Sequence, residues 1–134
     1  MDIKSLIKER DREDEGVDVP IYPRGFEPDP EAEEQPAPIT FTMLGRDATA
    51  VKDVLDRQAR EWQSEVRKSK GKFPKIDPAK TYANRVDVAV AALIGWTLND
   101  PLNDANARHV LADRHYLEQA ERGIYEHASF FEKA

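Results

Sequence analysis

Apolar residues recur at helical spacing through the second half of the chain, and their densest run lies within residues 85–96. The apolar positions of this run are Val86, Val90, Leu93 and Ile94. Their spacing of three or four residues predicts a buried helix over about residues 79–95, with Asp77 as its cap and Pro78 in its first turn. The sequence Asn99-Asp100-Pro101 then breaks the chain. We expect the most buried helix of the protein here.

Similar periodicity predicts further helices on both sides of this one. They cover about residues 48–68, 104–112 and 113–131. Asp47 and Asn103 stand where a side chain caps the first two of these helices. A smaller apolar stripe indicates a helix over residues 2–12, which is too short to be stable by itself. Its apolar residues are Ile3, Leu6 and Ile7.

Alternation of apolar and polar residues predicts two short strands. In residues 39–44, Ile39, Phe41 and Met43 share one face, with threonines on the other. Residues 17–22 alternate in part, and their proline restricts them to the edge of a sheet. The two segments are expected to pair antiparallel. The predicted fold is therefore mainly α, a small domain of three to four helices with a short N-terminal β-hairpin and an acidic, proline-rich arm.

Charge divides the chain into two parts. Residues 1–37 hold five basic and twelve acidic residues, whereas the remaining residues hold 15 basic and 14 acidic. We interpret residues 1–37 as a partly mobile arm with an edge strand that folding does not require, and residues 38–134 as an α-rich interaction domain. The negative arm disfavours nucleic acid as a partner, because phosphate would repel it, and it favours solubility or a basic protein partner.

Composition excludes several classes of chemistry. The chain has no cysteine, so disulfides, thiolate catalysis and cysteine zinc sites are impossible, and a reducing cytoplasm is the expected setting. No apolar run approaches the roughly 18 residues of a membrane span, and the N-terminus lacks the apolar core of a signal peptide. The histidines His109, His115 and His127 lack the i, i+4 spacing of a helical metal site. We expect no catalytic residue, metal or cofactor.

Large aromatic side chains are the candidate partner-binding residues. They are Trp62, Trp96, Tyr116, Phe130 and Phe131. Aromatics at helical spacing usually face the core, but a folded part of roughly 95 residues has limited interior volume, so some of them can line a groove for a partner. Because Phe130 and Phe131 are adjacent, they cannot face the same side of one helix. We expect one of the two to be an exposed anchor.

The order of short motifs resembles that of the small tail assembly chaperones of long-tailed bacteriophages. The motifs cover about residues 39–131 and comprise Ile39–Asp47, Gly95-Trp96-Thr97-Leu98, Pro101–Leu111, Tyr116-Leu117-Glu118-Gln119-Ala120 and a closing Phe. Tyr116 stands where that family is expected to have Trp, and the acidic arm lies outside the pattern.

The resemblance implies a non-enzymatic role in the host cytoplasm. Such a chaperone would bind the long helical tape-measure protein, keep it soluble and help tail-tube protein assemble around it, with neither nucleic acid nor membrane as a partner. A structural minor tail or head–tail joining protein of the virion is the alternative, since it would share the small size and the absence of chemistry. A small regulator of the host is a third interpretation, supported only by the acidic arm.

Overall fold

The computed structural model describes residues 2–27, 30–31, 37–70 and 72–131. Within these residues the chain forms six α-helices, one 3-10 turn and a three-stranded sheet. In chain order they are α1 (Ile3–Asp11), η1 (Arg12–Asp14), β1 (Val17–Ile21), β2 (Ile39–Met43), α2 (Thr49–Lys68), α3 (Pro78–Ala92), β3 (Leu93–Trp96), α4 (Asp104–Leu111), α5 (Arg114–Tyr125) and α6 (His127–Phe131). The mainly α fold class is confirmed.

The sheet is antiparallel in the order β1-β2-β3. The expected pairing of the first two strands is confirmed, with Val19 opposite Phe41, and Pro20 lies on the edge strand β1. Apolar side chains of β1 and β2 face inward, whereas alternate residues face away from the core. Helices α5 and α6 pack on this inner face, so the sheet and the C-terminal helices enclose the core.

The third strand corrects the expected hairpin. Residues 93–96 were predicted to end the central helix, but α3 ends at Ala92 and the chain becomes extended at Leu93. Strand β2 has a second open edge, and Leu93 pairs there with Met43 while the Leu44 N–H donates to the carbonyl of Ala92 at 2.8 Å. Backbone pairing along β2 therefore overrides the helical periodicity of the sequence.

The predicted C-terminal helix is two helices rather than one. Glu126 leaves helical geometry at φ −112° and ψ 26°, which separates α5 from α6. Together with α1, this break raises the number of helices in the described residues above the expected three to four. The buried face of α5 packs tightly against β1, where a Cβ added to Gly123 would lie 2.5 Å from Val19 Cγ2. Glycine is therefore needed at this crossing.

The cap of α2 also differs from the expected one. The side chain of Asp47 makes no cap, and Ala48 occupies the N-cap position. Instead, Asp14 reaches over from η1 and its Oδ1 accepts a hydrogen bond from the Thr49 N–H at 2.8 Å. The predicted caps of the next two helices are confirmed, since Asp77 accepts from the Ala79 N–H and Asn103 from the Asn106 N–H. Asp77 and Asn103 each cap the helix that directly follows them in the chain, whereas Asp14 caps a helix that begins 35 residues later.

The segment before β1 is joined to both ends of the folded body. The Gly45 N–H donates to the Glu13 carbonyl at 2.9 Å, and His127 Nε2 donates to the Glu15 carbonyl at 2.7 Å. The Glu13 carboxylate lies directly over Gly45, where any Cβ would overlap its Oε2. Residues 13–15 thus connect the end of β2 with α6.

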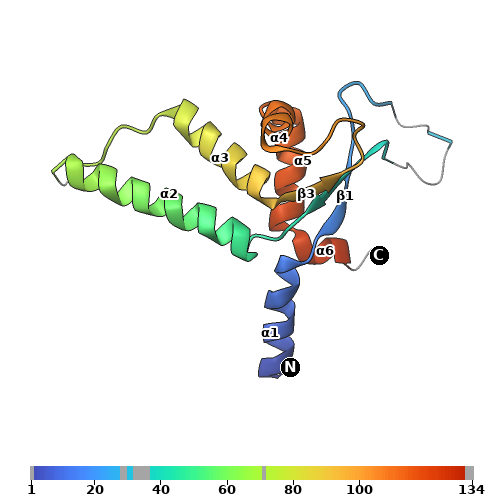
Figure 1. Ribbon diagram of the computed structural model, residues 1–134, viewed down its shortest axis with the longest axis horizontal. Helices are drawn as coiled ribbons and strands as arrows, with labels where there is room; N and C mark the ends of the chain where they lie inside the picture. Colours follow the sequence, from blue (N-terminus) through green and yellow to red (C-terminus); the bar gives the residue numbers. More distant parts are fainter. Residues whose placement is uncertain (1, 28–29, 32–36, 71, 132–134) are drawn as a thin grey trace.

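Two parts of the chain project from the body. Helix α1 extends away from it and buries none of its residues, and the pair α2–α3 extends in another direction, with the turn between the helices at its far end (Figure 1). The mobility of residues 1–37 stays a prediction, and residues 28–29 and 32–36 of that segment lie outside the described ones. Strand β1, in contrast, contributes Val17, Val19 and Ile21 to the core.

Two truncations should separate α1 from the segment that follows it. Deleting residues 1–10 is expected to leave the thermal midpoint within a few degrees, because α1 buries no residue. Deleting residues 1–15 removes three hydrogen-bonding partners of the body and should lower the midpoint by roughly 10 °C. Differential scanning calorimetry measures both values. Equal midpoints for the two truncations would contradict this role for residues 13–15.

A pair of substitutions tests the source of the α2 cap. Asp14→Ala should cost about 0.5–2 kcal/mol of unfolding free energy, as the loss of an N-cap does. Asp47→Ala is the matched control and should change stability by less than about 0.5 kcal/mol, because its side chain is exposed and makes no cap. Urea unfolding followed by circular dichroism gives both values, and a larger loss from Asp47→Ala would refute the assignment.

Candidate functional site

The structure separates the five candidate aromatic residues instead of bringing them into one site. Trp62 lies on α2 and is 41% exposed. Trp96 lies on β3, where its ring packs against Phe41 with 6.2 Å between centroids and its Nε1 donates to the Asp100 carbonyl at 2.9 Å. Trp96 therefore closes the turn after β3 and belongs to the core, whereas Trp62 is open to a partner.

The C-terminal aromatics are less exposed than the sequence suggested. Phe130 is 8% exposed, and Phe131 is half-buried, with its ring at 5.0 Å from that of His127. Both lie on α6, and the two adjacent rings face different ways, Phe130 toward the core and Phe131 against the ring of His127. The outward aromatic of this region is Tyr125, which is 56% exposed.

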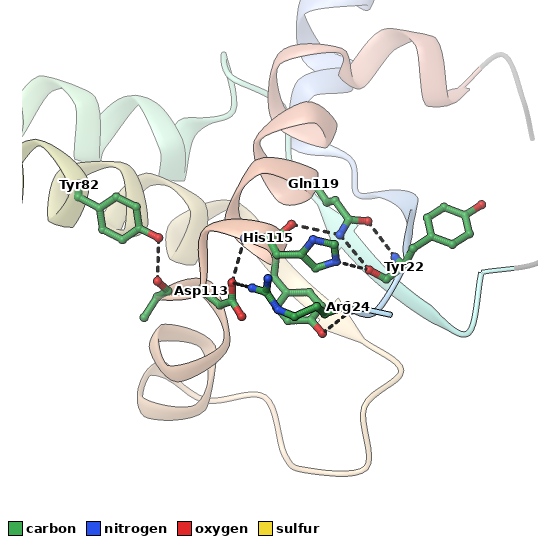
Figure 2. Close-up of polar contacts among 8 residues, drawn as sticks. Tyr22, Arg24, Tyr82, Asp113, His115 and Gln119 are labelled. Carbon is green, nitrogen blue, oxygen red and sulfur yellow. Dashed lines mark hydrogen bonds and ion pairs between the residues drawn. The ribbon is translucent and has the colours of Figure 1, made fainter. Parts of the chain in front are cut away.

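Tyr116 belongs to a polar network that holds the segment after β1 (Figure 2). Gln119 pairs with the backbone of Tyr22 in both directions, its Oε1 accepting from the N–H at 2.8 Å and its Nε2 donating to the carbonyl at 3.0 Å. His115 Nε2 donates to the same carbonyl, and the Tyr116 hydroxyl accepts from the Arg24 N–H at 3.3 Å. The motif around Tyr116 thus has a structural role, because it supplies hydrogen bonds to backbone groups that follow β1 and have no partner in the sheet.

An ion pair completes this network at the start of α5. Arg24 Nη2 lies 2.6 Å from Asp113 Oδ1, and the same oxygen accepts from the His115 N–H (Figure 2). Two hydrogen bonds lower the pKa of Asp113, and the one from the Arg24 side chain has a larger effect than the one from the His115 backbone. Since both side chains are solvent-exposed, the pair positions the segment more than it stabilises the fold.

Glu13 and His127 form the most buried ionisable pair of the described residues. His127 is 2% exposed, and its Nδ1 lies 3.3 Å from Glu13 Oε2, an oxygen with no hydrogen-bond partner. Burial raises the pKa of the Glu13 carboxyl, an effect that nearby His127 partly offsets. Both ring nitrogens of His127 face partners within the chain, so the pair links η1 to α6.

Within residues 2–27, 30–31, 37–70 and 72–131, no group of three or more His, Cys, Asp and Glu side chains could hold a metal ion. None of the helices described there has the length and apolarity needed to cross a membrane.

The apolar stripe of α2 loses its cover toward the turn that follows it. Val51 at the start of the helix is fully buried and Leu55 is half-buried, but Trp62, two turns further on, is exposed. Beyond it, Phe73 and Ile76 in the α2–α3 connection are 89% and 73% exposed. No helical or strand periodicity surrounds these two residues, and this is the signal in the sequence that they lie outside the core.

A groove of about 270 Å³ lies between the two helices at this point. Its base is closed by Gln58 Nε2, which donates to the Asn84 carbonyl at 2.9 Å. The lining residues are Gln58, Glu61, Trp62, Glu65, Lys75, Ile76, Asp77, Lys80, Thr81 and Asn84. We call this the hairpin groove. It combines two large apolar side chains with a charged rim, an arrangement typical of protein-binding surfaces.

A second apolar surface lies along α1. Ile3, Leu6 and Ile7 are all exposed on this projecting helix. Hollows beside it are lined by Ile7, Leu6 and the half-buried Phe131, with the Arg12 guanidinium 5.8 Å from the Phe131 ring. Phe131 is therefore the only one of the C-terminal candidates, among residues described by the structure, that shares a hollow with this helix.

Comparison with protein families gives the class of this protein. The model of the phage tail assembly chaperone family matches residues 29–126, which include every element from β2 to α5. The chain belongs to the phage tail assembly chaperone family, as the order of its motifs indicated. Comparisons with curated proteins and with solved structures found no match. The match begins after β1, so α1, η1 and β1 lie outside it.

The Glu13–His127 pair makes a testable contribution to pH dependence. Because the folded state holds the Glu13 proton more tightly than the unfolded chain, this group favours folding below its ordinary pKa of 4.5, and that contribution is lost as pH rises through the raised pKa. Glu13→Gln stays neutral, so its unfolding free energy relative to wild type should rise as pH increases from about 4 to 7.

Denaturant unfolding across this pH range checks the expectation. Glu15→Gln is the matched control, because its side chain is exposed and only its backbone carbonyl contacts His127. Identical pH profiles of unfolding free energy for Glu13→Gln and wild type would show that folding does not raise the pKa of the Glu13 carboxyl.

Proposed function

We propose that this chaperone binds the tape-measure protein in the host cytoplasm, keeps it soluble and assists assembly of tail-tube protein around it. The observation that carries the proposal is the hairpin groove, where Trp62 and Ile76 are exposed on a part of the chain that projects from the body. Phe73, in the same α2–α3 connection, is also exposed. Exposed apolar clusters of this kind on a small protein usually mark a binding surface.

The shape of the groove suits a helical client. Two diverging helices with apolar side chains between them accept the stripe of an amphipathic helix, whose anchors recur at i, i+3, i+4 and i+7. A tape-measure protein that is long and helical would offer such stripes repeatedly. Modest affinity at each groove, multiplied over several copies on one client, allows the chaperone to be displaced when the tube assembles.

The α1 stripe gives the protein a second apolar surface on another side of the body. We infer that it contacts the second protein of the assembly reaction, the tail-tube subunit. The separate directions of α1 and the α2–α3 pair support this assignment, because the two partners would not compete for one surface (Figure 1). Neither surface requires a cofactor, so the proposed role is non-enzymatic.

Co-expression with the tape-measure protein tests the function. This chaperone should raise the soluble yield of that client, and Trp62→Ser should reduce co-purification because an aromatic anchor of an interface typically contributes about 2 kcal/mol or more. Tyr125→Ser is the matched control, since Tyr125 is also an exposed aromatic but lies on α5, away from the groove.

The far-ultraviolet circular dichroism of both variants should match that of the wild type. A client that is equally soluble without the chaperone, or equally weakened by Tyr125→Ser, would overturn the proposal. Mass spectrometry of purified virions separates the chaperone from a structural tail protein, because a chaperone should be absent from the finished particle.

A further inference from the structure

Positive charge is concentrated at the end of the α2–α3 pair. Residues 66–80 hold six basic residues and one acidic residue, whereas the rest of the chain holds 14 basic and 25 acidic residues. The basic residues are Arg67, Lys68, Lys70, Lys72, Lys75 and Lys80, and all six are exposed. We call this segment the basic tip. It lies at the far end of the α2–α3 pair, away from the sheet (Figure 1).

The charges of the basic tip lack the ion pairs that several arginines of the body make. Examples in the body are Arg85–Glu121 at 2.5 Å and Arg108–Asp87 at 2.6 Å. At the tip, Arg67 Nε contacts only the backbone carbonyl of Gln63, and none of the six forms an ion pair with any residue the structure describes. A cluster of like charges without counter-charges repels itself, and an acidic partner would relieve that repulsion.

Apolar groups are interleaved with these charges. Phe73 stands between Lys72 and Lys75 in sequence, and Ile76 follows directly. Lys75 and Ile76 both line the hairpin groove that contains Trp62. The basic tip and the apolar part of the groove therefore adjoin, so one ligand can contact both.

We propose that the basic tip and the hairpin groove together recognise an acidic amphipathic helix. The apolar stripe of that helix lies over Trp62 and Ile76, and its acidic residues face the lysines of the tip. The inference rests on the proposed function, because it specifies which segments of the tape-measure protein the chaperone selects. Complementary charge would give the interaction orientation and a fast association rate.

Acidic groups inside the groove limit where the acidic residues of the bound helix can lie. Glu61 and Glu65 line the groove one turn apart on α2, and α2 runs toward the tip. An acidic residue of the client beside Glu61 would be repelled, whereas one beyond Glu65 would meet the tip. The acidic residues of the client are therefore expected at one end of its apolar stripe, not along its whole length.

The same acidic groups argue against nucleic acid as the ligand. Glu61, Glu65 and Asp77 would face a phosphate backbone laid in the groove, and the remainder of the chain is strongly acidic. Phosphate repulsion over that area opposes the attraction of the tip. A helix with charge at one end avoids this repulsion, so the protein ligand is favoured.

Two labelled peptides test the inference by fluorescence polarisation. Both are 18-residue amphipathic helices with one leucine stripe, and they differ in having glutamates or lysines at one end. The wild-type protein should bind the glutamate peptide about tenfold more tightly than the lysine peptide, and this preference should shrink as salt rises from about 50 to 200 mM.

Charge reversal at the tip is the decisive variant. Lys70→Glu, Lys72→Glu and Lys75→Glu together should abolish or invert the preference between the peptides. The matched control reverses Lys4, Lys8 and Arg10 to Glu on α1, which changes net charge equally and should keep the preference. All altered residues are exposed, so both variants should keep the wild-type circular dichroism spectrum.

Three results would overturn the inference. They are equal affinity for the two peptides, an unchanged preference after reversal of the tip, and tighter binding of a duplex DNA oligonucleotide than of the glutamate peptide. If one of these results is found but Trp62→Ser still reduces co-purification of the tape-measure protein, the proposed client binding stands and only the selection of acidic segments fails. If the client never depended on the chaperone, the proposed function itself fails.

Discussion

The structure depends on satisfying both edges of strand β2. An extended strand carries backbone donors and acceptors on each side, and a buried strand cannot leave them unpaired. On one side β1 pairs with β2, which draws the N-terminal part of the chain into the fold. On the other side β3 pairs with it, and this pairing ends α3 at Ala92. The positions of η1, α2 and α3 follow from these two pairings, because each of them adjoins a strand of this sheet in the chain.

A small core leaves the projecting parts without cover. Helices α5 and α6 cover the inner face of the sheet. The second half of α3 adds buried residues beside it, which are Val86, Val88, Ala89 and Ala92. Helix α2 is 20 residues long, so its end extends beyond anything the body can place against it. The apolar residues that remain there are then available to a partner, which is the property a chaperone needs. The small interior volume of the chain thus explains both the packed body and the projections that nothing in the body covers.

The family motifs act mainly within the fold. Asn103 caps α4, Trp96 closes a turn, and Gln119 satisfies the backbone after β1. Gly45 is required because the Glu13 carboxylate lies over it. These motif residues hold the scaffold of this chain, whereas the groove and the tip that we propose for client recognition lie between the motifs.

Local sequence determined much of this protein. The amphipathic stripes of α2, α4 and α5, the alternation in β2, and the caps Asp77 and Asn103 each depend on residues within one or two turns, so they could be predicted from the chain alone. The aromatic candidates could be identified in the same way, but not their exposure.

Tertiary structure decided the rest. The conversion of residues 93–96 into a strand, the cap of α2 by Asp14 and the buried link from Glu13 to His127 all join segments far apart in sequence, where periodicity carries no information. The exposure of Trp62, Phe73 and Ile76 likewise depends on how far α3 covers α2. The physical reason is that burial is a property of what packs against a residue, and one segment of sequence does not contain its packing partners.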